Sequence, residues 1–158
     1  MSSRGSYPLE AARVLRAEEE DAALRALAQA TSAHDEAQRG RVRLEEAQRA
    51  HRGETERVAS DERQRDQAGR SVAEMVRARE WLAHREREVR ELARRTDDAR
   101  QRERDARAAM ELARSALASA RAEREAVEKH HASWLDEQRR TREKREEDEA
   151  DDRSRRRS

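Results

Sequence analysis

The stretch Gly69-Arg70-Ser71-Val72-Ala73-Glu74 decides the fold, because one helix can end and another can begin within it. Glycine is the residue that most readily takes the left-handed conformation at a helix C-terminus. Ser71 and Glu74 have the spacing of a capping box, in which each side chain accepts a hydrogen bond from the backbone amide of the other residue. The sequence therefore predicts a helix end, a turn at 69–71 and a new helix from residue 72.

The segments on either side of this turn have the composition of long helices and not of a round domain. Of the 158 residues, 46% are charged and 34% are hydrophobic, with one proline and no phenylalanine. Globular domains usually contain about 45–50% apolar residues. Alanine, glutamate, arginine and leucine dominate the sequence, and they are strong helix formers. Such a chain can bury a stripe along a helix but cannot bury a round core.

Apolar residues recur at steps of three and four, which places them on one face of each predicted helix. The clearest stripe in the second helix is Glu103, Ala106, Met110, Ala113, Leu117, Ala120, Arg124, Val127, His131, Trp134 and Gln138. Upstream it is Val72, Met75, Arg79, Leu82, Glu86 and Val89, with a phase slip expected near Leu92 and Ala93. In the first helix the stripe is His34, Ala37, Arg41, Leu44, Gln48, His51, Thr55 and Val58. The better, more apolar part of that helix is expected to be Leu9, Val14, Leu15, Leu24 and Leu27.

These stripes predict an all-α fold, a long antiparallel two-helix coiled-coil hairpin with a short turn near Gly69–Ser71. A turn this short forces antiparallel packing, so the numbers of facing residues should sum to about 140. The expected neighbours are Val58 with Leu82, Leu27 with Ala113, and Leu9 with His131 and Trp134.

The predicted organisation has five parts: a flexible N-terminus at 1–8, a helix at 9–68, the turn at 69–71, a second helix at 72–150 and a polar tail at 151–158. The second helix should overhang the first by roughly 10–20 residues as an unpaired extension. Gly40 and Gly53 lie inside the first helix without a cap after them. We expect local fraying or gentle bends there, because glycine is a poor helix former.

Charge is balanced along the chain, with 37 basic and 36 acidic residues and a net charge of +1. A nucleic-acid-binding domain normally carries a basic excess on one face, whereas closely alternating signs are typical of solvated helix faces. Arg155, Arg156 and Arg157 could bind an anionic surface or nucleic acid. Nearly all of the basic residues are arginine, which a GC-rich genome explains more simply. We therefore predict no nucleic-acid partner.

The sequence contains no motif for catalysis or for cofactor binding: no P-loop, no GxSxG, no HExxH and no Cys/His zinc spacing. His130 and His131 are adjacent, so on a helix they point about 100° apart and cannot chelate one ion together. No apolar run approaches the roughly 18 residues of a membrane span, and residues 1–8 lack the apolar core of a secretory signal. We expect a non-enzymatic, cytoplasmic protein without metal, cofactor or membrane insertion.

The three aromatic residues are interpreted one by one. Tyr7 is expected to be a mobile residue that flanks the first helix, and Trp134 to close the end of the apolar stripe. Trp81 lies beside the stripe, so two interpretations stay open. It either contacts a partner, since exposed tryptophans are frequent binding hot spots, or packs over Val58 and Thr55.

Both ends of the chain carry recognisable patterns. The opening is Tyr7-Pro8-Leu9-Glu10-Ala11-Ala12-Arg13-Val14-Leu15-Arg16, followed by Glu18-Glu19-Glu20-Asp21-Ala22-Ala23 and Leu27-Ala28. The closing pattern runs from Trp134-Leu135 through Arg139-Arg140 and Glu143-Lys144 to Asp148-Glu149-Ala150 and Arg153. Together with the length, the hairpin and the restart after Gly69, these patterns resemble the FliJ/YscO family of type III secretion proteins. Glu147 stands where that family tends to have an apolar residue.

The resemblance implies a central stalk of a type III secretion system, of either the injectisome or the flagellar kind. Family members insert their paired ends into a hexameric export ATPase, reach the cytoplasmic ring of the export gate with the turn, and in some cases bind secretion chaperones. The implied ATPase-facing residues are Leu9, Arg13, Leu15, Leu27, Val127, Trp134, Asp148 and Glu149. The implied gate-facing residues are Met75, Trp81 and Leu82.

This interpretation places the protein in the cytoplasm, peripherally at the base of a secretion apparatus on the inner membrane. The alternative is a generic structural coiled coil that acts as a scaffold or forms homodimers. Such a protein would show an equally good apolar stripe without special ends.

Overall fold

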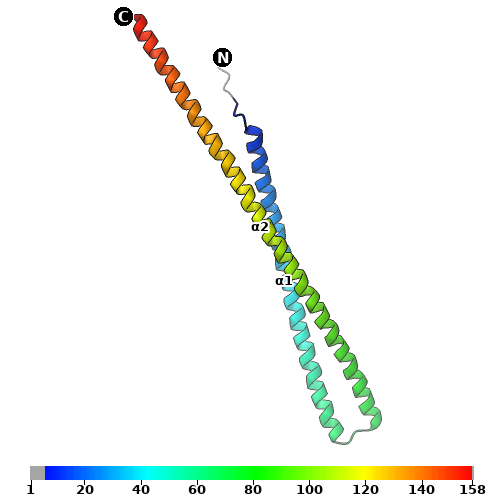
Figure 1. Cartoon of the computed structure of the whole chain (residues 1–158). Helices are drawn as coiled ribbons and strands as arrows, with labels where there is room; N and C mark the ends of the chain where they lie inside the picture. Colours follow the sequence, from blue (N-terminus) through cyan, green and yellow to red (C-terminus); the bar gives the residue numbers. More distant parts are fainter. Residues whose placement is uncertain (1–5, 158) are drawn as a thin grey trace. The chain divides into compact units, whose positions relative to one another are not determined.

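The computed structural model describes residues 6–157, and these residues form two α-helices and no strand (Figure 1). Helix α1 spans Glu10–Gln67 and helix α2 spans Val72–Arg157. A short turn joins the helices, which pack against each other in antiparallel orientation. The predicted all-α hairpin is confirmed. None of the helices that the structure describes has an apolar stretch of the kind needed to span a membrane.

The turn has the chemistry that the sequence predicts. Gly69 has a φ of 94°, a left-handed conformation that side chains disfavour. The backbone N–H of Glu74 donates to Ser71 Oγ at 3.3 Å, and the backbone N–H of Ser71 donates to Glu74 Oε2 at 3.0 Å. The capping box therefore satisfies amides that the first turn of a helix leaves unpaired.

The structure divides into two compact units. The terminal unit contains the described residues up to Leu27 and those from Leu112 onward. The turn unit spans Ala28–Glu111. Each unit contains one piece of α1 and one piece of α2, and each therefore has its own seam, the line of side chains between the two helices.

Ion pairs between the helices confirm the predicted register. In the terminal unit, Arg13 Nε lies 2.9 Å from Glu128 Oε1, and Arg16 also pairs with α2. In the turn unit, Arg85 Nη2 lies 2.6 Å from Glu54 Oε2, and Arg41 pairs with Glu103. The residue numbers in each of these pairs sum to about 140, as expected for a hairpin with so short a turn.

The seam positions of α2 are confirmed in one part and corrected in another. From Glu103 to Trp134 the predicted stripe is buried or half-buried, whereas Gln138 is exposed. Upstream of Glu103 the predicted Val72, Arg79 and Glu86 are exposed. The less exposed positions that keep steps of three and four there are Met75, Ala78, Leu82, Arg85, Val89, Leu92, Thr96 and Ala99; Glu88, Glu91 and Ala93 beside them are also half-buried.

The phase slip predicted near Leu92 and Ala93 is therefore wrong. Counting back from Glu103 in steps of four and three reaches Ala99, Thr96 and Leu92 without interruption. Thr96 is the most buried residue, with 0% of its surface exposed. A slip would rotate the downstream part of the helix relative to its partner, and the regular spacing of the buried positions shows none.

Helix α1 shows a similar division. The predicted stripe from His34 to Val58 is buried or half-buried, with Thr55 the most buried of its residues. The expectation that Leu9, Val14, Leu15 and Leu24 belong to the seam is wrong, because all four are exposed. The less exposed positions in this part of α1 include Arg13, Arg16, Glu20, Ala23 and Leu27. They keep the spacing of three and four, which Val14 and Leu15 do not fit.

The end of α2 differs from the sequence-based expectation. Helix α2 continues to Arg157, so most of the predicted polar tail is helical. Helix α1 runs through Gly40 and Gly53 without a break, and the expectation of fraying or gentle bends there stays a prediction. Residues 1–5 of the predicted flexible N-terminus and Ser158 of the tail lie outside the described residues.

Candidate partner-binding surfaces

A cluster of aromatic rings holds the start of the described chain against α2 in the terminal unit. Tyr7 is only 7% exposed, and its hydroxyl lies 2.7 Å from Nδ1 of His130. Its ring centroid lies 4.6 Å from that of His131 and 5.5 Å from that of Trp134. The expectation of a mobile Tyr7 is therefore wrong. Trp134 closes the seam as predicted, and Tyr7 is the residue that it meets.

Further from the chain ends than this cluster, charged side chains form the seam of the terminal unit. Glu20 of α1 accepts hydrogen bonds from Arg124 at 2.9 Å and from Arg121 at 3.3 Å. The hydrogen bond from Arg124 is the main reason that the pKa of Glu20 lies below its ordinary value. The Arg13 guanidinium donates to Glu128, and this bond is the main cause that raises the pKa of Arg13. The predicted contact residue Arg13 is thus engaged within the hairpin.

Beyond Trp134, helix α2 continues without a partner helix. Every side chain from 135 to 156 is exposed. Asp148 and Glu149, two of the predicted contact residues, lie in this overhang, where Arg153 Nη2 is 3.4 Å from Glu149 Oε2. The predicted overhang is present and somewhat longer than expected. Leu27 and Val127, by contrast, are half-buried positions of the seam.

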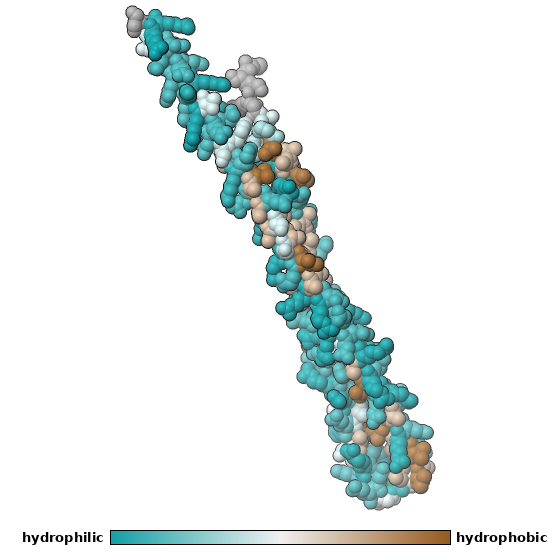
Figure 2. Space-filling view, in the orientation of Figure 1, coloured by the Kyte–Doolittle hydropathy of each residue, from teal (hydrophilic) through white to brown (hydrophobic). Residues whose placement is uncertain are grey.

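The terminal unit also exposes aliphatic side chains, and Figure 2 shows hydrophobic residues gathered over the first turns of α1. Val14 is 50% exposed and Leu15 is 51% exposed. Leu9 immediately precedes α1 and is 43% exposed. Among the predicted ATPase-facing residues, Leu9, Leu15, Asp148 and Glu149 are therefore exposed, whereas the other four pack or pair within the hairpin.

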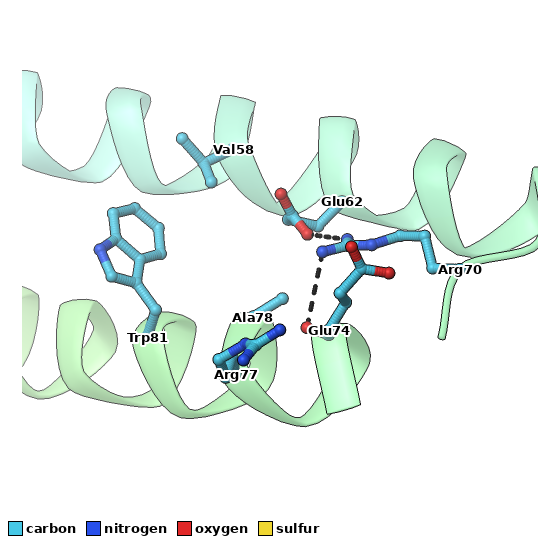
Figure 3. A pocket seen from close by; sticks show the side chains of 7 residues that line it. All are labelled: Val58, Glu62, Arg70, Glu74, Arg77, Ala78 and Trp81. Atoms are coloured by element: carbon cyan, nitrogen blue, oxygen red, sulfur yellow. Dashed lines mark hydrogen bonds and ion pairs between the residues drawn. The ribbon is translucent and has the colours of Figure 1, made fainter. Parts of the chain in front are cut away.

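In the turn unit, Arg70 ties the two helix ends together. Its guanidinium pairs with Glu62 and donates to the backbone carbonyl of Glu74 at 3.5 Å (Figure 3). It also lies 3.6 Å from Asp66 Oδ1. The hydrogen bond from Arg70 is the largest cause that lowers the pKa of Glu62. These contacts join the last turns of α1 to the first turn of α2 and fix the geometry of the turn.

A shallow groove of about 320 Å³ lies beside this ion pair, as Figure 3 shows. Its lining residues are Val58, Glu62, Arg70, Glu74, Arg77, Ala78 and Trp81. Trp81 is 41% exposed, and the Arg85 guanidinium carbon lies 5.4 Å from its ring centroid. Trp81 shares the groove with Val58, so one side of the indole borders α1 while a large part stays accessible.

The other predicted gate-facing residues, Met75 and Leu82, are half-buried in the seam of the turn unit. Sequence reasoning missed Val72 and Val76 as exposed aliphatic residues at the start of α2. Counting back from Glu103 in alternating steps of four and three residues would have placed Ala78 in the seam. It would have left both valines out of the seam. The same counting in α1 would have moved Val14 and Leu15 to the outer surface. No signal in the sequence pointed to the packing of Tyr7.

Among the described residues, no group of three histidine, cysteine, aspartate or glutamate side chains has an arrangement that could hold a metal ion. The surfaces offered to a partner are therefore a bare charged helix, exposed aliphatic side chains and a groove beside a tryptophan. Such features suit binding to other proteins, in which aromatic and aliphatic anchors contribute most of the affinity.

Comparison with known proteins gives one match. The family model described as "YscO-like protein" matches residues 4–154 of the chain. No curated protein matches the sequence, and no solved structure matches the fold.

Proposed function

Because the chain belongs to the YscO-like protein family, a family of structural proteins associated with type III secretion, we propose that it is the central stalk and regulator of an export ATPase. The proposed partners are the hexameric type III secretion ATPase, the cytoplasmic ring of the export gate and secretion chaperones. The proposed location is the cytoplasmic base of the apparatus, at the inner membrane.

The bare overhang of α2 is the observation that supports this proposal best. Residues 135–156 form a helix whose side chains are all exposed, directly beyond the point where Tyr7 meets Trp134. A charged helix without a partner gains little stability from its own packing, so retaining it is easiest to understand if another protein binds it. The terminal unit, which holds both chain ends, would enter the ATPase hexamer.

The turn unit would face the export gate. Trp81 and the groove beside Arg70 offer an anchor of the kind that binding sites use. Charged surroundings make such contacts sensitive to salt, which suits association that must be reversible.

The proposal is tested by the rate of ATP hydrolysis of the cognate export ATPase with and without the full-length chain. We expect the full-length chain to stimulate hydrolysis and a variant truncated after Gln138 to lose that effect. Every side chain described between 139 and 156 is exposed, so the hairpin should remain folded by circular dichroism. A Val76→Ser variant in the turn unit is the matched control and should stimulate like the wild type.

Stimulation that survives the truncation would show that the overhang is not the contact. Absence of both stimulation and co-elution with the hexamer would contradict the stalk function. The generic coiled-coil scaffold would then be the better interpretation.

A further inference from the structure

The first turns of α1 reverse the usual arrangement of an amphipathic helix. Arg13, Arg16 and Glu20 point to α2 and form ion pairs across the seam. Val14 and Leu15 are about half exposed on the other side of the same helix. Since branched aliphatic side chains gain free energy when water is excluded from them, this arrangement leaves apolar surface uncovered.

These aliphatic residues belong to a continuous surface, which we call the outer face. It is formed by Ala11, Val14, Leu15, Glu18, Asp21 and Ala22, all of them exposed. Ala11, Leu15 and Ala22 follow one another at steps of four and seven, so they lie on one line along the helix. The two alanines leave room for another backbone to approach closely on either side of Leu15.

Glu18, at the middle of the outer face, has no cation within reach on its own helix. Its neighbours at steps of three and four are Val14, Leu15, Asp21 and Ala22, and none is basic. No hydrogen bond or ion pair engages Glu18 or Asp21 in the part of the chain that the structure describes.

The adjacent acidic residues behave differently. Glu19 accepts a hydrogen bond from Arg16 at 2.6 Å, and Glu20 accepts from Arg121 and Arg124. The chain therefore supplies cations to the carboxylates on the seam side of this segment. On the outer face Glu18 has no basic neighbour at steps of three or four, and Asp21, which has Arg25 four residues later, forms no ion pair among the described residues.

We propose that the outer face docks into an apolar recess of a partner protein whose rim places arginine or lysine side chains against Glu18 and Asp21. The aliphatic pair would fill the recess, and the two carboxylates would fix the orientation. This inference rests on the proposed function, which makes the export ATPase the partner.

Charge argues against the other occupants. In a twofold pairing of two outer faces, Glu18 and Asp21 of each copy would lie near the same acids of the other copy, and like charges repel. Nucleic acid and anionic lipid are disfavoured for the same reason. A partner with basic side chains around an apolar recess fits both properties of the surface.

The test measures the affinity of the full-length chain for the cognate ATPase at low and at moderate salt. We expect Leu15→Gln to weaken binding by about tenfold or more, as for an interface anchor. Glu18→Gln should weaken binding at low salt and reduce the dependence of affinity on salt, because one charge pair is lost. The matched control is Leu112→Gln, which changes a leucine that is 73% exposed on α2 of the same unit and should bind like the wild type.

The outcomes separate this inference from the proposed function. If the wild type binds and Leu15→Gln binds equally well, the outer face is not the contact, while the stalk function stands. Equal weakening by Leu112→Gln would also overturn the inference. If the wild type does not bind, both proposals fail. A dimer in analytical ultracentrifugation that Leu15→Gln dissociates would identify a second copy as the occupant and overturn the inference. Circular dichroism checks that each variant is folded.

Discussion

The hydroxyl of Tyr7 lies 2.7 Å from Nδ1 of His130, which is 123 residues further along the chain. This contact fixes the segment before α1 against α2 and determines where pairing in the terminal unit ends. Beyond Trp134 the helix is bare. The length of helix available to a partner is therefore set by a tyrosine that lies outside both helices.

Replacing Tyr7 should loosen this end of the terminal unit in two steps. Tyr7→Phe removes one hydrogen bond and should cost about 1 kcal/mol. Tyr7→Ala also removes the ring contacts with His131 and Trp134 and should cost about 2 kcal/mol or more. Urea denaturation measures both, and amide hydrogen exchange should show faster opening around residue 130 in Tyr7→Ala. Equal stability of Tyr7→Ala and the wild type would contradict the ring cluster.

Glycine replacements should change stability in opposite directions at different sites. A Cβ at Gly40 or Gly53 would meet no atom within 4 Å, and both residues lie inside α1. Gly40→Ala and Gly53→Ala should each stabilise the protein by about 1 kcal/mol. Gly69→Ala should instead be destabilising, because the φ of +94° disfavours a side chain. Thermal unfolding of the three variants checks the signs, and a destabilising Gly53→Ala would be inconsistent with a regular helix there.

The stability that the capping box contributes should depend on pH. Hydrogen bonds from the Ser71 hydroxyl and then from the Ser71 amide lower the pKa of Glu74 in the folded protein. A lowered folded pKa means that the stabilisation is present above the unfolded pKa of about 4.3 and is lost as pH falls through the lower folded value. Ser71→Ala should cost about 1 kcal/mol at pH 7, and the cost should shrink in more acidic solution.

The measurement for the capping box is the urea midpoint of Ser71→Ala and the wild type at pH 7 and near pH 3. The same substitution in a Glu74→Gln background is the control, since that side chain does not titrate. A cost in the wild-type background that does not change with pH would count against the role of the Glu74 charge.

The ion pair between Arg41 and Glu103 should matter more for the register in which the two helices pair than for the free energy of unfolding. Both are half-buried seam residues of the turn unit, and the hydrogen bond to Glu103 is the main cause that raises the pKa of Arg41. Arg41→Leu alone should lower the melting temperature, because it leaves Glu103 with an uncompensated charge. Arg41→Leu with Glu103→Leu should recover or exceed the wild-type value, as with other buried pairs. A double variant no more stable than the Arg41→Leu single variant would argue against this account.

The seam position of Thr96 provides a test of the uninterrupted spacing. Its hydroxyl donates to the carbonyl of Leu92 at 2.8 Å, so the threonine satisfies its own polar group while its side chain is buried. Thr96→Lys should cost at least about 2 kcal/mol, because it places a charge in the seam. Asp97→Lys, at the next and exposed position, breaks only an exposed ion pair with Arg100 and should cost no more than about 1 kcal/mol. Chemical denaturation compares the two, and the reverse order would indicate a shifted seam.

Much of the fold is predictable from the sequence because its signals are local. The glycine and capping box between 69 and 74 mark the end of one helix and the start of the next through backbone chemistry within a few residues. The short turn then leaves antiparallel pairing as the only arrangement, and the register follows from it. The stripe from Glu103 to Trp134 is clear because apolar residues occupy most of its positions.

The seam residues were predicted wrongly where two sets of positions on one helix, both spaced by three and four, could each have faced the partner helix. Near the start of α1, the most apolar positions are Val14 and Leu15, yet the seam takes Arg13 and Arg16. Near the start of α2, the predicted stripe took Val72, which is 77% exposed. The hydrophobicity of a few neighbouring residues does not show which set of positions faces the partner. The set that does so is the one that stays in contact with the partner helix over many turns.

The sequence by itself determined that the chain forms two helices, where the turn lies and in which register the helices pair, since these follow from helix propensity, capping and loop length. Only the tertiary structure decided which side of each helix end stays exposed and that Tyr7 packs on His131 and Trp134. The physical reason is that both depend on contacts between the two helices or their ends, which join residues more than a hundred positions apart in the terminal unit and about thirty apart in the turn unit. Their free energy is shared along a whole seam and cannot be assigned to any one stretch of sequence.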